Sequence, residues 1–99
     1  MNNIEFLKAR IRWADAHPLR LKVAELLLDK KKYKNQQAVA DELGILGTSL
    51  SRIINAKTTP RDITLATLQR FSKVLKMPHY MLWQQVNDWW AEEPKKEDF

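Results

Sequence analysis

Apolar residues recur along this chain at the three- and four-residue spacings of helices, and strand-like alternation of apolar and polar residues is weak throughout. Glycine and proline, which interrupt helices, are scarce, with two glycines and four prolines among 99 residues. The pattern therefore predicts an all-α fold, a five-to-six-helix bundle whose helices are joined by short turns.

The first two predicted helices meet at His17-Pro18. The first begins at a cap provided by Asn2 or Asn3 and extends to about residue 16. Its apolar face consists of Ile4, Leu7, Ile11 and Ala14. Pro18 suits the first turn of the second helix, which should end in the lysine run 30–32, where cations are favourable against the helix dipole. The second helix should bury Val23, Leu26 and Leu27.

Both glycines of the chain lie three residues apart in the segment GILGTSLSRIINAK, residues 44–57. A short predicted helix, 36–43, is followed almost at once by another, from about residue 47 to residue 56. A stop this abrupt needs a residue with φ > 0, so Gly44 is predicted to form the turn. Gly47 has two interpretations, either a simple helix start or a point where backbone N–H groups can approach a phosphate closely.

The predicted helix 47–56 has two opposite faces. Its apolar side chains lie on one side and are Leu50, Ile53 and Ile54. They match the inward face of the preceding helix, which consists of Val39, Ala40 and Leu43. Thr48, Arg52 and Asn55 point the other way. Short polar groups around one guanidinium are suited to hydrogen bonding with base edges and phosphates rather than to packing.

The net charge of +5 is concentrated in one part of the chain. Residues 19–61 carry nine Lys or Arg against four Asp or Glu, whereas the tail 91–99 carries two lysines against four carboxylates. Basic blocks in a small domain commonly meet phosphate, but the run 30–32 is also typical of a solvated helix end. Charge alone therefore does not decide the function.

The composition, 44% hydrophobic and 29% charged, is typical of one small folded domain. No apolar run approaches the roughly 20 residues needed to span a bilayer, and the N-terminus lacks the apolar stretch of a signal peptide, so we expect a cytoplasmic location. The chain has no cysteine, and its two histidines, His17 and His79, lie at helix boundaries as caps or surface residues. We expect no metal site, no cofactor and no enzymatic activity.

The segment QQAVADELGILGTSLSRIINAKTTP resembles, without gaps, the helix-turn-helix of the lambda-repressor-like, xenobiotic-response-element (XRE) family. Gln36 matches the glutamine that opens the motif, Gly44 the turn glycine and Ser51-Arg52-Ile53 the family's Ser-Arg-Ile. Further matches are Ala40, Ile45, Leu50, Asn55 and Lys57. Downstream, LATLQRFSKVLKMPHYML resembles the family's fourth helix and the start of its fifth, with apolar positions at Leu65, Leu68, Phe71, Leu75, Met77 and Leu82. The resemblance covers roughly residues 19–82.

The resemblance implies binding of double-stranded DNA through the second helix of the motif. Major-groove contacts would come from Thr48, Ser49, Ser51 and Arg52, with the backbone exposed at Gly47. Sugar-phosphate contacts would come from Gln36, Asn55 and Lys57. Leu46, Gly47 and Ala56 depart from the family pattern, which affects the sequence readout rather than the fold. Ile54 replaces a frequently acidic residue and should find an apolar partner, such as the extra N-terminal helix.

The last predicted helix carries more aromatic surface than one helix on a small bundle ordinarily needs. The residues concerned are Tyr80, Trp83, Val86, Trp89 and Trp90. We favour a two-fold dimer contact, because exposed apolar patches mark interfaces. The alternative is that Trp83 and one of Trp89 or Trp90 complete the core. The acidic tail is expected to be solvated and frayed.

We therefore expect an extra N-terminal helix (1–18), a helix-turn-helix DNA-binding domain with a C-terminal dimerisation helix (19–90) and a flexible acidic tail (91–99). The expected function is a transcription regulator, a repressor, that binds a palindromic operator as a homodimer. Two alternatives stay open. One is an antitoxin that binds both operator DNA and a toxin protein, and the other is a protein-binding adaptor that has lost DNA binding.

Overall fold

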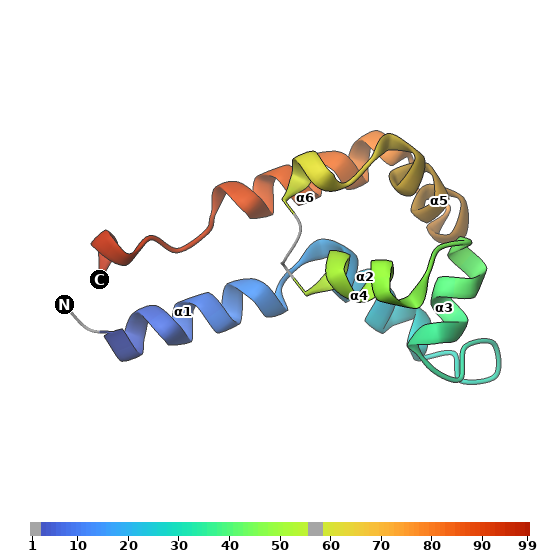
Figure 1. The fold of residues 1–99 in the computed structure, drawn as a ribbon, viewed down its shortest axis with the longest axis horizontal. Coiled ribbons are helices and arrows are strands. Elements are labelled where there is room, and N and C mark those ends of the chain that lie inside the picture. The colour runs from blue at the N-terminus through green and yellow to red at the C-terminus, as the bar shows by residue number, and fades with distance from the viewer. Residues whose placement is uncertain (1–2, 56–58) are drawn as a thin grey trace.

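The computed structural model describes residues 3–55 and 59–99, and in these ranges the chain is all-helical, as predicted (Figure 1). The α-helices are α1 (Asn3–Asp15), α2 (Pro18–Leu27), α3 (Gln36–Leu43), α4 (Gly47–Ile54), α5 (Leu65–Leu75) and α6 (His79–Ala91), and two short 3₁₀ segments are η1 (Pro60–Asp62) and η2 (Lys96–Asp98). The proposed cap at Asn2 lies outside the described residues.

Helices α2 to α6 form a bundle, and α1 extends from it to give an elongated molecule of 46 × 26 × 20 Å (Figure 1). The segment after α6 runs back beside α1. Arg10 on α1 pairs with Glu93 at 2.8 Å, and the rings of Phe6 and Phe99 meet edge to face at 5.8 Å. In this structure the tail 91–99 therefore contacts α1 at both Glu93 and Phe99.

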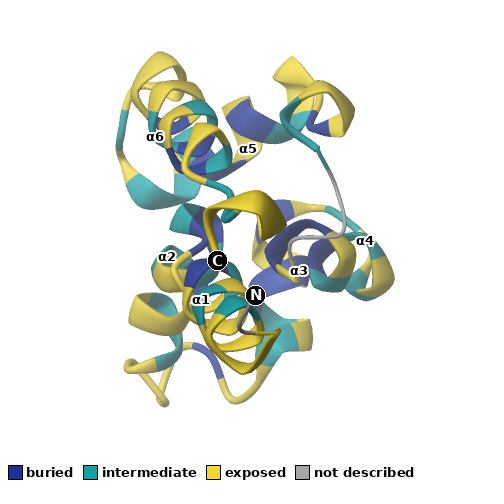
Figure 2. Ribbon diagram, turned by 90° about the vertical axis from the view of Figure 1, so that its left-hand side faces the viewer, coloured by how far each residue is buried: buried dark blue, intermediate teal, exposed yellow. Residues whose placement is uncertain are grey.

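The core lies where α2 to α6 face one another (Figure 2). Its fully enclosed side chains include Leu19, Val39, Ala40, Leu50, Phe71 and Leu82. Tyr33 and Ile63 reach the same cluster from segments between helices. Leu65 was expected among the apolar core positions, but it is 58% exposed, because it begins α5 directly after the cap residue Thr64 and points to solvent.

Trp13 and Trp89 join α1 to α6. Their rings stack at 4.3 Å with 5° between their planes, and each indole N–H donates to the other residue's carbonyl, at 2.9 and 2.7 Å. This double contact satisfies both buried indole donors, which buried tryptophan requires. It also turns the predicted apolar face of α1 outward, so that Ile4, Leu7 and Ile11 are 64%, 56% and 62% exposed.

The proposed dimer residues divide into two groups. Val86 and Trp89 are 2% and 6% exposed, so they belong to the interior of the single chain and offer no free contact surface. The sequence predicted a dimer contact at these two residues, and this prediction is wrong for both, since Val86 packs in the central cluster and Trp89 on Trp13. Tyr80 and Trp83 are 65% and 51% exposed and remain on the surface. Trp90 is partly buried beside Trp13 and Trp89.

His17 caps α2, as expected, but from a fully buried position. Its Nδ1 accepts a hydrogen bond from the backbone N–H of Leu19 at 3.1 Å, and its ring lies 4.3 Å from that of Trp89. Nδ1 must stay unprotonated to accept this bond, so the neutral ring carries its hydrogen on Nε2. Desolvation by burial, followed by the charge of Arg20, lowers the pKa of His17 to about 4.

This lowered pKa predicts a loss of stability in mild acid. Between pH 6.5 and about 4, His17 binds a proton in the unfolded chain but stays neutral in the folded chain. The free energy of unfolding should therefore fall by roughly 3 kcal/mol as the pH drops through this window, and stay constant with respect to His17 above it. Chemical denaturation at pH 7 and pH 4.5 measures the difference.

The matched variants are His17→Asn, which keeps a side-chain oxygen for the Leu19 N–H, and His79→Asn, which changes the exposed histidine. We expect His17→Asn to lower stability at pH 7 and to remove most of the pH dependence, while His79→Asn retains it. Equal pH dependence in His17→Asn and the parent would contradict the assignment.

Candidate nucleic-acid interface

The turn between α3 and α4 is formed by Gly44, as predicted. Gly44 has φ 72° and ψ 30°, the left-handed conformation that disfavours residues with a Cβ. The N–H groups of Gly44 and Ile45 donate back to the carbonyls of Asp41 and Ala40, both at 3.1 Å. These bonds end α3 sharply and satisfy part of its otherwise unpaired C-terminal carbonyls.

Arg70, on α5, completes this turn from outside. Its Nη1 donates to the carbonyls of Leu43 and Gly44 at 3.3 and 3.2 Å, and a Cβ on Gly44 would overlap the same nitrogen. The cation also sits at the negative end of the α3 dipole. The sequence predicted the turn at Gly44 but not its contact with Arg70, because nothing in the spacing of these two residues indicates it.

Gly47 starts α4 after Leu46, which makes no side-chain cap bond. A Cβ on Gly47 would overlap Oε1 of Gln37, whose Nε2 donates to Asp41 at 2.9 Å. Gln37 on α3 therefore lies directly over the start of α4. Since Gly47 does not have positive φ, its lack of a side chain makes room for this flexible amide rather than for an unusual backbone.

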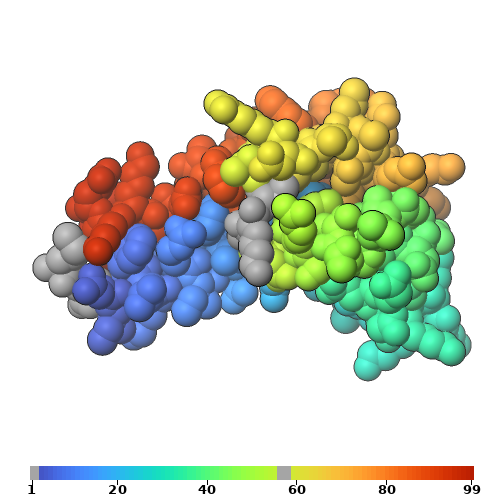
Figure 3. Space-filling view, in the orientation of Figure 1, coloured from blue at the N-terminus to red at the C-terminus, as the bar shows by residue number. Residues whose placement is uncertain are grey.

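The two faces of α4 are as predicted. Leu50, Ile53 and Ile54 are at most 8% exposed and join the core that α2 and α3 also line. Ile54 thus finds its partner in the bundle core. The opposite face carries the exposed Thr48, Arg52 and Asn55 and the half-buried Ser49 and Ser51. Helix α4 forms the yellow-green surface near the middle of Figure 3. Lys57 and Ala56 lie outside the described residues.

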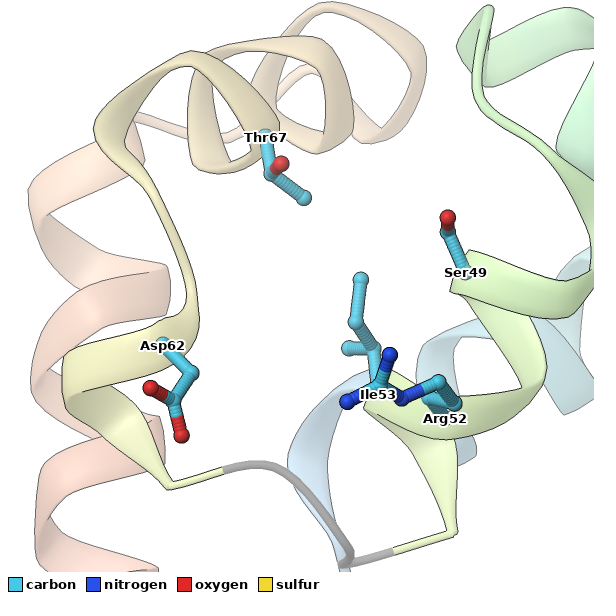
Figure 4. Close-up of a pocket in the computed structure, with 5 residues that line it drawn as sticks. All are labelled: Ser49, Arg52, Ile53, Asp62 and Thr67. Atoms are coloured by element: carbon cyan, nitrogen blue, oxygen red, sulfur yellow. The ribbon is translucent and has the colours of Figure 1, made fainter.

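Arg52 reaches from α4 over a cleft of about 230 Å³ that separates this helix from η1 and the start of α5 (Figure 4). The cleft is lined by Ser49, Arg52, Ile53, Asp62 and Thr67. Asp62 accepts a hydrogen bond from the Thr59 hydroxyl at 2.9 Å, which anchors this carboxylate within its own turn. The cleft is thus lined by two hydroxyls, one guanidinium and one carboxylate.

Asn55 lies at the end of α4 and is already hydrogen-bonded. Its Oδ1 accepts from Nη1 of Arg20 on α2 at 2.9 Å, and its Nδ2 donates to Oγ of Ser51 at 3.1 Å. Nη2 of Arg20 is 3.9 Å from a carboxylate oxygen of Asp15, the last residue of α1. The sequence pattern indicates Arg20 only as part of the net charge, because nothing in it predicts a contact with Asn55, 35 positions away.

Gln36 begins α3, where Asn35 caps the helix by accepting from the N–H of Ala38 at 3.0 Å. The lysine-rich segment precedes this start. Lys32 is engaged within it, 3.8 Å from Glu42 and over the ring of Tyr33. Lys34 is exposed directly before the cap. The start of α3 and the outward face of α4 therefore combine helix N–H groups, hydroxyls, amides and cations, which are the donors that bind phosphate and base edges.

Comparisons of the chain with models of known protein families, with curated proteins and with solved structures find no match. Within the described ranges, the helices are too short or too polar to cross a membrane.

An added methyl group should affect stability differently at the two glycines. Gly44→Ala should lower the free energy of unfolding by about 1–2 kcal/mol, because alanine is strained at positive φ and the methyl group meets Arg70. Gly47→Ala should stay within ~0.5 kcal/mol of the parent, because it has only to displace the end of the Gln37 side chain. Chemical denaturation of the two variants tests this difference.

Proposed function

We propose that this chain is a sequence-specific double-stranded-DNA-binding regulator of transcription, a repressor, in which α3 and α4 act as a helix-turn-helix. The observation that carries the proposal is the outward face of α4. Its polar side chains point away from a helix whose other face is buried, and a fixed turn sets the helix against α3. A helix presented in this way fits the major groove, where side chains can contact base edges.

Each part of this surface has a separate role in the proposal. Thr48, Ser49, Ser51 and Arg52 contact bases, and Gln36, Asn55 and Lys57 contact the sugar-phosphate backbone. With no side chain at Gly47, the α4 backbone can approach the groove once the Gln37 amide that lies over this position moves aside. Arg52 has the longest donor on the exposed face of α4, and a guanidinium can bind guanine O6 and N7 with two hydrogen bonds.

Selection from a random duplex pool tests whether a preferred sequence exists, and a palindromic product supports a symmetric dimer. On the selected site, Arg52→Ala should cost about 1–3 kcal/mol and relax preference at one base pair per half-site. Lys34→Ala, at the exposed cation before α3, should weaken all duplexes alike and reduce the salt slope by about one unit. Binding is measured by fluorescence anisotropy of labelled duplexes.

An equal loss on every sequence for Arg52→Ala would show that Arg52 is a phosphate contact and that bases are contacted elsewhere. Failure of the parent to bind any duplex at low salt would favour the protein-binding adaptor instead.

The homodimer forms, in this proposal, through the outer face of α6. Tyr80, Met81 and Trp83 are exposed there and line one shallow groove with Gln84 and Gln85. A two-fold contact between such patches is isologous. To bind a palindromic operator, the dimer must place its two α4 helices one helical turn of DNA apart, about 34 Å.

The double variant Tyr80→Ser, Trp83→Ser should raise the dimer dissociation constant by about tenfold or more, because it removes exposed aromatic contacts without opening the core. Leu65→Ser is the matched control, an exposed apolar residue at the start of α5, and should leave association unchanged. Sedimentation equilibrium measures both. A monomeric parent at high concentration would remove the basis for this interface.

The outward apolar face of α1 favours a second candidate, the antitoxin. Ile4, Leu7 and Ile11 stand on a helix held away from the bundle, on the side opposite Trp13. A toxin protein covering this face would leave α4 accessible to operator DNA. A toxin gene beside the gene for this chain, whose product is inhibited only when these side chains are intact, distinguishes the antitoxin from a plain repressor.

A further inference from the structure

We infer that Arg20 and Asn55 together form a phosphate anchor at the C-terminal end of α4, with Arg20 as the charged group and Asn55 as the residue that positions it. The inference rests on the proposed function, since the phosphate belongs to duplex DNA. It adds a residue of α2 to the proposed DNA surface, whose other residues belong to α3, to α4 and to the segment after α4.

The geometry places Arg20 within a short chain of polar contacts. Its Nη1 donates to Asn55 at 2.9 Å, and Asn55 donates to Ser51 at 3.1 Å, so the guanidinium is connected to two residues of the proposed DNA surface. Its side chain is 42% exposed. A guanidinium has five N–H donors in a planar fork, and the bond to Asn55 engages only one edge of it.

Fixing the orientation of this cation matters for binding. An arginine side chain that moves freely loses conformational entropy when it binds a phosphate. An arginine that a neighbouring residue already holds in place loses less entropy. Arg20 is held from α4 itself, and the cation lies at the negative end of the α4 dipole, where it is stabilised. The anchor is therefore pre-formed in the protein without DNA.

Asp15 opposes the anchor. Its carboxylate lies 3.9 Å from Nη2 of Arg20 and is 65% exposed, so the pair is weak and competes with a phosphate for the same cation. Because Asp15 ends α1, the position of α1 determines how much of the Arg20 charge is offset. A phosphate contact carries no sequence information, so both effects should appear equally on cognate and unrelated duplexes.

The experiment measures duplex affinity against salt concentration for the full chain and four variants, on the selected duplex and on a scrambled one. Arg20→Ala should weaken binding to both duplexes about tenfold and lower the salt slope by about one unit. Arg20→Lys should keep the slope and lose only part of the affinity, because the charge remains and the fork is lost. Asp15→Asn should tighten binding to both duplexes by about twofold.

Lys22→Ala is the matched control. It removes one positive charge from the same helix, but Lys22 pairs with Glu25 and lines the groove between α2 and α6, away from Asn55. Its salt slope should equal that of the parent. Thermal unfolding of each variant distinguishes an effect on binding from an effect on folding. If Arg20→Ala is destabilised, the anchor is tested by Arg20→Lys and Asp15→Asn instead.

If Arg20→Ala and Lys22→Ala lose the same amount of duplex affinity, the effect comes from the overall charge of the protein. That result would overturn the anchor. An unchanged salt slope in Arg20→Ala, or an unchanged affinity in Asp15→Asn, would show that Arg20 only joins α2 to α4. In each of these cases the parent still binds DNA and the proposed function stands. A parent that binds no duplex at low salt removes the proposed function and the anchor with it.

Discussion

The structure depends on the left-handed turn at Gly44 and its closure by Arg70, because α3 and α4 are each only eight residues long. Isolated helices shorter than about 12–15 residues are marginal in water. These two persist because each buries three residues in the common core, and the turn fixes the angle at which they do so. The direction of the outward face of α4 follows from that inward packing and not from any property of its polar side chains.

The surface that we propose for DNA is assembled by neighbours rather than by α4 alone. The start of α4 has no side-chain cap and is overlaid by Gln37, while its end is tied to α2 through Asn55 and Arg20. Asp15 extends this connection to α1. A change in how α1 docks would therefore alter the charge balance at the end of α4 without moving the core.

Local signals in the sequence predicted α3, the turn at Gly44, the two faces of α4 and the cap at His17, because each depends on residues close together in the chain. Contacts between distant residues were not predictable in this way. The 3.6-residue pattern indicated an apolar face on α1, but the pairing of Trp13 with Trp89 determines which face is buried. The same pairing buries Trp89, which the sequence predicted at a dimer surface. Arg20 gave no signal because an arginine on a helix is ordinarily just solvated.

The pairing of Trp13 with Trp89 has a consequence for the biosynthesis of the protein. The two residues are separated by 76 positions, so during translation α1 leaves the ribosome long before its partner exists. At about 5–20 residues per second, this delay is roughly 4–15 s. Until Trp89 has been made, the α1 segment lacks the contact that buries Trp13 in the folded protein, and Ile4, Leu7 and Ile11 have no cover even there. That interval is when a chaperone or a neighbouring nascent chain has the greatest access to α1.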